Sequence, residues 1–436
     1  MSPRSVRDVL FVVAVVCVGF LGCRSRIERP NVLVVTLDTT RKDHLGFYGY
    51  GRATSPNLDT LAESSVVFTR AVAASSWTLP SHASIFTGKF PTSHGARYDP
   101  EGPLRLSQAI AGPEEWDGYR ASPLSPAETT LAAILREAGY RTGAVVGGPW
   151  MKRVFGLSQG FERYDDDGIV DVNGKLASEV TSSALSFLEE CDGKPFFLFL
   201  NYFDPHGPYD APAPFRGTFG NEPSDRYDEE ILYMDHHLGR LLAGMKTLGV
   251  FEKTLIVVTA DHGELLGEHG KMGHGATLFE EEIRVPFLVK YPGSERPPAR
   301  TDDGVHHVDV LPMVLDRLGL PVPRGIQGGV PPTRDRPLIA EVDPLPFMSA
   351  EGSFRALYLG RYKLLWNGLG ESALYDIEAD GNEHKDLSAS EPGRTSNAVA
   401  LLEKYLASLP PPGDTAQPTT LDEATLEALR KLGYVP

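Results

Sequence analysis

Three short, almost entirely apolar runs along the chain each end on an aspartate. They are residues 31–38, 196–204 and 254–261. Such continuous apolar runs are typical of strands buried on both faces. Ligands of open parallel sheets bind beyond the carboxyl ends of the strands. We therefore expect the terminal residues Asp38, Asp204 and Asp261 to lie at one shared site.

Segments with apolar residues at helical spacing separate these runs. The expected helices are residues 129–138, 178–190 and 228–248, with further short strands at 143–147 and 285–291. This alternation predicts an α/β fold with a mostly parallel central sheet covered on both faces. Residues 99–128 are rich in Pro, Gly and Glu, which predicts a surface excursion.

A cluster of Pro and Gly predicts a linker at residues 321–345, between a catalytic domain at 30–320 and a smaller subdomain at 346–436. Residues 354–366 have the pattern of a β-hairpin that turns near Gly360. A further strand and helical stretches are expected at 373–377, 397–407 and 421–432. The smaller unit is therefore predicted to be an α+β subdomain with an antiparallel sheet.

The first 23 residues resemble an export signal. Arg4 and Arg7 precede an apolar run from Val9 to Gly22, which is short for a membrane span. The run ends at Cys23 in a sequence similar to a bacterial lipoprotein cleavage box. We expect export to the periplasm or cell envelope, with lipid attachment at Cys23. A simple signal peptide and a short uncleaved anchor remain alternatives.

Composition narrows the function classes. The 436 residues carry a formal net charge of −16 and no basic patch, which argues against nucleic-acid binding. An anionic substrate would have to be held locally, and a bound cation is the obvious means. Beyond the leader, Cys191 is the only cysteine, so no intramolecular disulfide can form once the leader is removed.

Four residues have the chemistry of a metal-activated nucleophile site. Asp261 and His262 are adjacent at a strand end and could present oxygen and imidazole to one cation together with Asp38. Pro80 and Gly88 predict a helix that begins at Thr78, where free amides favour an anion. Taken singly, Asp38 or Thr78 could equally be a helix cap. A metal at the Thr78 oxygen would instead activate it as a nucleophile.

Two histidines in loops are further candidates. His206 follows the end of a strand and could donate a proton to a leaving oxygen. His274 lies twelve residues beyond His262. As single residues among 12 histidines, both are more often structural or exposed than catalytic.

Several blocks, in order, resemble the sulfatase family of the alkaline phosphatase superfamily. They are Asn31–Gly49, Ser55–Asp59, Thr78–Gly88, Asp204–Tyr209, Asp261–Gly263, Glu281–Pro286, Gly360–Leu365 and Leu374–Glu383. The resemblance implies an alkaline-phosphatase-like α/β sandwich that hydrolyses sulfate or phosphate esters of small molecules, glycans or lipids. It also implies one or two divalent cations, which could be Ca, Mn, Mg or Zn.

The same resemblance implies a role for each candidate residue. Asp38, Asp261 and His262 match metal ligands, and Thr78 matches the nucleophile, which also contacts the metal. His206 matches a histidine that contacts the substrate or donates a proton. His274 stands where many sulfatases have a substrate-binding Lys, and His82 stands where the family has Arg. We therefore expect His82, His206 and His274 to bind substrate.

The departures from the family pattern change the expected chemistry. Typical sulfatases oxidise a Cys or Ser at the position of Thr78 to formylglycine, so no formylglycine is expected here. Thr39 replaces the second Asp of the usual metal pair. Thr nucleophiles occur in phosphodiesterases and phosphoethanolamine transferases of the same superfamily, which are the alternative functions. Those transferases usually carry several transmembrane helices, which this sequence does not predict beyond the leader. A non-catalytic surface binding protein is the least favoured alternative.

Overall fold

The structure is a computed structural model that describes residues 29–112, 114–332, 336–345 and 351–413. The expected leader at residues 1–23, including Cys23, and the expected helix at 421–432 lie outside these residues. Among the described residues, no helix is both long and apolar enough to cross a membrane.

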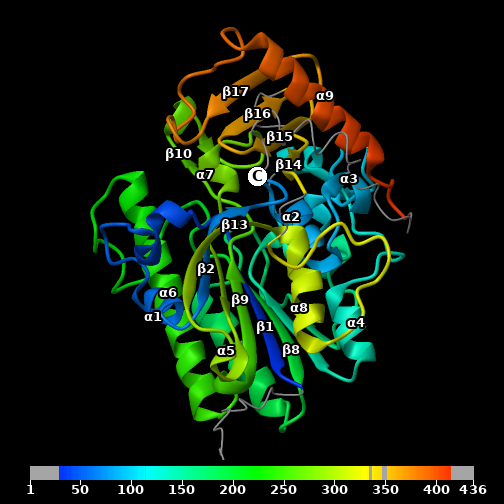
Figure 1. Cartoon of the computed structure of the whole chain (residues 1–436). Coiled ribbons are helices and arrows are strands. Elements are labelled where there is room, and N and C mark those ends of the chain that lie inside the picture. Colours follow the sequence, from blue (N-terminus) through cyan, green and yellow to red (C-terminus); the bar gives the residue numbers. More distant parts are fainter. Residues whose placement is uncertain (1–28, 113, 333–335, 346–350, 414–436) are drawn as a thin grey trace, which may run out of the picture.

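A central sheet of eight strands forms the larger domain, in the order β13-β2-β12-β9-β1-β8-β6-β7 (Figure 1). The strands are β1 (Asn31–Leu37), β2 (Val66–Val72), β6 (Arg141–Val146), β7 (Arg163–Asp165), β8 (Phe196–Tyr202), β9 (Thr254–Thr259), β12 (Phe287–Lys290) and β13 (Ala299–His306). Only β12 pairs antiparallel with its neighbours. The predicted mostly parallel sheet is confirmed, and the three Asp-terminated runs form its adjacent strands β8, β1 and β9.

Helices cover both faces of this sheet, which explains why every residue of β1 is buried. Figure 1 shows α1 (Pro56–Ala62), α5 (Ala177–Glu190) and α6 (Pro223–Thr247) on one side. The other side carries α2 (Thr78–Thr87), α4 (Leu131–Glu137) and α8 (Val310–Leu318). Helix α6 begins five residues earlier than expected. Pro223 opens it, and the Asp225 carboxylate accepts the Glu222 amide at 3.1 Å.

The expected surface excursion at residues 99–128 contains structure of its own. Strand β5 (Arg120–Ser122) pairs with both β3 (Arg97–Tyr98) and β4 (Leu104–Arg105) in a small three-stranded sheet. The short helix α3 (Pro91–His94) precedes it. These strands are too short to produce a detectable alternation of apolar and polar residues.

The smaller subdomain is an antiparallel sheet of β14 (Leu338–Val342), β15 (Phe354–Leu359), β16 (Tyr362–Trp366) and β17 (Ser372–Asp376). Helix α9 (Pro392–Ser408) packs against it through a separate apolar core that includes Leu357 and Leu402. The predicted hairpin is confirmed, with Gly360 in the left-handed region at φ 62°. Strand β14 lies within the expected linker at 321–345, so part of that segment belongs to this sheet.

Candidate active site

The carboxyl ends of the two central strands β1 and β9 bring three metal-type ligands together. Asp38 directly follows β1, and Asp261 and His262 follow β9. One ligand atom from each of these residues lies within 4.8 Å of the others, and all three side chains are fully buried. No second group of this kind occurs in the described part of the chain.

The two carboxylates are only partly satisfied by hydrogen bonds. The Asn201 amide donates to Asp38 Oδ2 at 3.1 Å. The amides of Thr39 and His262 donate to Asp261 Oδ1 at 3.2 and 2.9 Å. Asp38 Oδ1 and Asp261 Oδ2 are buried without a hydrogen-bond partner. Two unpartnered carboxylate oxygens facing one space fit a cation, because burying unpaired charge is otherwise costly.

The pKa values of the Asp38 and Asp261 carboxylates also indicate a cation site. Burial and the neighbouring Asp261 raise the pKa of Asp38 well above its ordinary value. Burial likewise raises the pKa of Asp261. A divalent cation would reverse both shifts by favouring the ionised carboxylates.

His262 is oriented as a metal ligand. Its Nδ1–H donates to the Gly263 carbonyl at 3.0 Å, which leaves the Nε2 lone pair facing the site. Nε2 lies 3.3 Å from Asp261 Oδ2 and 3.3 Å from the Thr78 hydroxyl. Burial lowers the pKa of His262 well below its ordinary value, so the ring is neutral. The backbone approach at this turn requires Gly263, since a Cβ there would lie 1.9 Å from the Glu281 carbonyl oxygen.

Thr78 is the first residue of α2, and its side chain is almost completely buried beside His262. The predicted helix is confirmed, and it ends at Gly88 with φ 66°. The hydroxyl thus stands at a helix N-terminus, where the amides favour an anion. A hydroxyl next to both a metal-type triad and an anion-favouring helix end can attack a sulfuryl or phosphoryl group.

The backbone beside Asp38 is strained. Thr39 adopts φ 52°, which is rare for a β-branched residue and costs about 1–3 kcal/mol. The Thr39 hydroxyl donates to the Pro205 carbonyl at 2.8 Å, and the Tyr227 hydroxyl donates to the Thr39 carbonyl at 2.7 Å. These bonds hold the Thr39 amide on Asp261. Thr39 therefore contributes a backbone donor where the family's second Asp would contribute a ligand.

His82 does not face an open space. Its Nδ1–H donates to the Thr78 carbonyl at 2.8 Å, and its Nε2 is hydrogen-bonded to the Thr36 hydroxyl at 2.9 Å. The side chain is fully buried, and burial lowers its pKa to about 4. No ring nitrogen remains for a substrate. We therefore correct the expected substrate-binding role of His82 to support of the first turn of α2.

His206 and His274 lie together beside the metal-type triad. Their ring centroids are 5.1 Å apart, and the His274 ring lies 4.4 Å from that of His262. The His206 ring stacks on Phe203, and its Nδ1–H donates to the Gly207 carbonyl at 2.8 Å. Burial and His274 lower the pKa of His206 to about 4. Without substrate, His206 is therefore neutral.

Glu264, which no motif of the sequence singles out, holds His274. Its Oε1 lies 3.1 Å from His274 Nδ1, and its side chain is buried. Burial alone would lower the pKa of His274, but Glu264 and Asp261 raise it above the ordinary value. The two-residue strands β10 (Leu265–Leu266) and β11 (Met272–Gly273) bring the pair together. No periodic signal in the sequence predicts strands this short.

Asp204, the third strand-terminal aspartate, does not join the triad. Its Oδ1 accepts the Ala177 amide at 2.9 Å, at the N-terminus of α5. The expected shared site therefore contains two of the three strand-terminal aspartates. Asp204 serves as an N-terminal acceptor for a helix, the alternative use of such a residue.

Comparisons with known proteins agree with this arrangement. The family model described as Sulfatase matches residues 30–320. The ulvan-active sulfatase of Formosa agariphila is 26% identical over 470 residues, which cover 94% of this chain and 88% of that protein.

Two solved structures have the same fold. The crystal structure of Ps i-CgsB in complex with k-i-k-neocarrahexaose gives a TM-score of 0.70 at 22% identity, covering 93% of this chain and 97% of that chain. The phosphonate monoester hydrolase of Agrobacterium radiobacter gives a TM-score of 0.68 at 20% identity, covering 87% and 95%. The predicted fold class is confirmed by these matches.

Proposed function

Because this chain belongs to the sulfatase family, we propose that it hydrolyses sulfate or phosphate esters with unmodified Thr78 as nucleophile and a divalent cation as cofactor. The observation that carries the proposal is the position of the Thr78 hydroxyl. It lies 3.3 Å from Nε2 of His262, in the one described group of metal-type ligands. A binding protein without catalysis would have no use for a buried hydroxyl at that point.

Asp38, Asp261 and His262 would hold the cation, with the Thr78 oxygen as a fourth donor. When bound, the cation would polarise the ester and stabilise the ionised Thr78 hydroxyl. Oxygen and imidazole donors of this kind suit Zn, Mn and other borderline or hard ions. The buried, unpartnered oxygens of Asp38 and Asp261 fit such an ion.

The chain's own residues then divide the reaction into two steps. The Thr78 oxygen forms a bond to the sulfur or phosphorus, and the bond to the leaving alcohol oxygen breaks. The amides at the start of α2 stabilise the negative charge of the transferred group. Water then attacks the sulfur or phosphorus, the bond to the Thr78 oxygen breaks, and the hydroxyl is regenerated with release of the inorganic anion.

We infer that His206 or His274 protonates the leaving oxygen, because their rings lie together beside His262. The hydrogen bond from His274 Nδ1 to Glu264 fixes the orientation of that ring, as a carboxylate does for other catalytic histidines. His206 has only a backbone carbonyl as Nδ1 partner. We therefore assign proton donation to the His274–Glu264 pair in preference to His206, which is left to contact the substrate.

The substrate class is proposed from the relatives. One is by name active on ulvan, and another was solved with a neocarrahexaose, which favours a sulfated glycan here. The phosphonate monoester hydrolase and the unmodified Thr78 favour a phosphate ester as the second candidate. The sequence of residues 1–23 leads us to propose export, so that the protein would meet such polymers outside the cytoplasm.

The proposal is tested with purified protein of measured metal content on three substrates: an aryl sulfate, an aryl phosphate monoester and an aryl phosphate diester. We expect turnover of at least one substrate, and a loss of about 10³-fold or more in Thr78→Ala. Thr78→Ser, shown by mass spectrometry to carry an unoxidised serine, is the matched control, because it keeps the hydroxyl and should retain measurable activity. Full activity of Thr78→Ala on the best substrate would contradict the proposal.

A further inference from the structure

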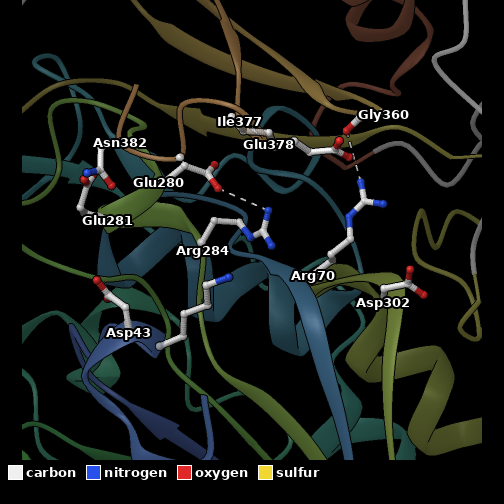
Figure 2. Close-up of a pocket in the computed structure, with 12 residues that line it drawn as sticks. Asp43, Arg70, Glu280, Glu281, Arg284, Asp302, Gly360, Ile377, Glu378 and Asn382 are labelled. Atoms are coloured by element: carbon white, nitrogen blue, oxygen red, sulfur yellow. Dashed lines mark hydrogen bonds and ion pairs between the residues drawn. The ribbon is translucent and has the colours of Figure 1, made fainter. Parts of the chain in front are cut away.

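A polar cavity lies between the large domain and the C-terminal sheet. Its volume is about 460 Å³, within the roughly 300–1,000 Å³ usual for ligand pockets. The wall combines cations, carboxylates and an amide from both domains; it includes Lys42, Arg70, Arg284, Glu281, Glu378 and Asn382. Figure 2 shows Arg70 and Arg284 pointing toward the segment of Ile377 and Glu378.

The cationic side chains of this pocket make few or long hydrogen bonds. Arg284 is nine-tenths buried, and its Nε has no hydrogen-bond partner. Lys42 donates only to the Thr69 carbonyl, at a long 3.4 Å. Arg70 reaches the Gly360 carbonyl, also at 3.4 Å. Burial and the charge of the nearby Arg284 lower the pKa of Lys42 to about 8.

Two carboxylates of the wall, the buried Glu280 and the exposed Asp43, are paired with cations. Glu280 forms ion pairs with Lys363, whose Nζ lies 3.1 Å from Oε1, and with Arg284. Asp43 receives Arg41 at 2.8 Å. Glu281 Oε2 lies 3.5 Å from His269 Nε2 and has no hydrogen-bond partner among the described residues. Lys42 and Arg70, which line the pocket together with Arg284, therefore keep donors for an external anion.

The rim of the pocket has the opposite character. Asp302, Glu378 and Asn382 are exposed and line the same cavity. Their oxygens can accept hydrogen bonds from hydroxyl groups. Cationic donors inside and carboxylate and amide acceptors at the rim match a hydroxylated ring that carries a sulfate or carboxylate group.

The pocket shares a wall with the active site. The amide of Gly263, next to the metal-type ligand His262, donates to the Glu282 carbonyl at 2.7 Å. Glu281, the neighbouring residue, lines the pocket. Both belong to α7 (Glu280–Ile283), which the turn after His262 packs against. Both sites therefore include residues that adjoin α7.

We propose that Lys42, Arg70 and Arg284 bind an anionic sugar unit of the substrate, away from the ester that is cleaved. This rests on the proposed function, because it assigns the unit to the same glycan. The anion would be a sulfate or carboxylate, and the hydroxyls of the ring would meet Asp302, Glu378 and Asn382. The pocket would thereby select polyanionic chains over esters with a single charged group.

A crystal soak with selenate tests the anion site directly. Selenate has the shape and charge of sulfate, and its selenium is located by anomalous scattering. We expect a peak between Lys42 and Arg284 in the wild-type protein, and loss of that peak in Lys42→Met. No peak at this position, at a selenate concentration that fills other sites, would overturn the proposal.

Binding of a chondroitin sulfate hexasaccharide, measured by calorimetry, separates a glycan site from a free-anion site. We expect Lys42→Met to raise the Kd about tenfold, as loss of one charge-assisted bond does, with a smaller rise for Arg70→Gln. Lys253→Met, which removes an exposed charge near the start of β9, should leave the Kd unchanged. A selenate peak without any change of Kd in Lys42→Met would mean an adventitious ion only, and would overturn the proposal.

The two proposals fail separately. Full activity of Thr78→Ala would contradict the nucleophile without affecting the selenate peak or the hexasaccharide Kd. Conversely, an unchanged Kd in Lys42→Met would overturn the anionic sugar site and leave the assignment of Thr78 intact.

Discussion

Two buried clusters of charge lie a short distance apart in this chain and are balanced in opposite ways. In one, Lys363 bonds Glu383 at 2.9 Å and Glu280 at 3.1 Å, and Arg284 joins Glu280 at 3.3 Å. In the other, Asp38 and Asp261 face each other with only neutral groups as partners. Both clusters connect segments that are distant in sequence.

The pKa values of Glu280 and Asp38 record this difference. Burial raises the pKa of Glu280, but Lys363 and Arg284 hold it below its ordinary value. Burial and Asp261 instead raise the pKa of Asp38. A cluster that contains its own cations stabilises the joint between the domains, whereas a cluster that lacks them is suited to receive one from outside. The balance of charge, more than the mere presence of buried acids, thus distinguishes a structural cluster from a metal site.

The largest expected effect comes from Asp38→Asn, which removes half of the unbalanced charge. We expect loss of bound metal and a fall in activity of about 10³-fold or more, because the nucleophile is no longer activated. Mass spectrometry measures the bound metal, and initial rates measure the activity. Asp204→Asn is the matched control, since it changes a strand-terminal Asp outside the triad and should keep its metal. Retention of metal by Asp38→Asn would break the comparison.

Lys363→Met should damage the balanced cluster in a different way. It leaves Glu383 and Glu280 buried with too little positive charge, so the free energy of unfolding should fall by about 3–5 kcal/mol. Chemical denaturation measures this, and metal content per folded molecule should stay unchanged. Arg361→Gln provides the control, because its exposed pair with Asp376 is worth about 0–1 kcal/mol. Equal losses of unfolding free energy in Lys363→Met and Arg361→Gln would contradict the stabilising role of the Lys363 cluster.

The sequence predicts the unbalanced cluster better than the balanced one. Asp38, Asp261 and His262 end strongly apolar strands, so their pattern shows both the fold and the edge where they meet. Thr78 is placed by Pro80 and Gly88. The partners of these residues are harder to predict, because Thr39 and Glu264 act through a strained backbone and a two-residue strand pair.

Longer elements also escape prediction where their surroundings are polar. Strand β2 contains Thr69 and Arg70, which interrupt its apolar run. Strand β13 is at the edge of the sheet, and the first six of its eight residues are not buried. The network around Lys363 depends on contacts between two domains, which no local pattern records.

Glu264→Gln should reduce kcat by roughly 10–100-fold, because His274 loses the carboxylate that orients it. The variant retains a side chain of the same shape, and metal content should be unchanged. A pH profile of kcat distinguishes this effect on His274 from a general loss of structure. Without the Glu264 carboxylate the pKa of His274 should fall, so the corresponding limb of the profile should move to lower pH. An unaltered profile with reduced kcat would instead indicate a purely structural role.

The smallest effect is expected at Glu230, a buried acid that accepts the Asp210 amide at 2.8 Å and belongs to neither cluster. Burial and Asp204 raise its pKa to about 9, so the folded chain holds the proton more tightly than the unfolded chain. Stability should therefore fall as pH rises from about 4.5 to 9. Glu230→Gln should raise Tm more at pH 8.5 than at pH 5, as measured by calorimetry. An equal gain at both values would contradict this.

The central claim is tested most directly by trapping the intermediate on the unbalanced cluster. Wild-type protein is quenched in acid during turnover of its best aryl ester, and the peptide that contains Thr78 is examined by mass spectrometry. The account predicts a sulfuryl or phosphoryl group on the Thr78 oxygen, with otherwise unmodified Thr in the resting protein. A transferred group on another residue, or an oxidised side chain at position 78, would contradict it.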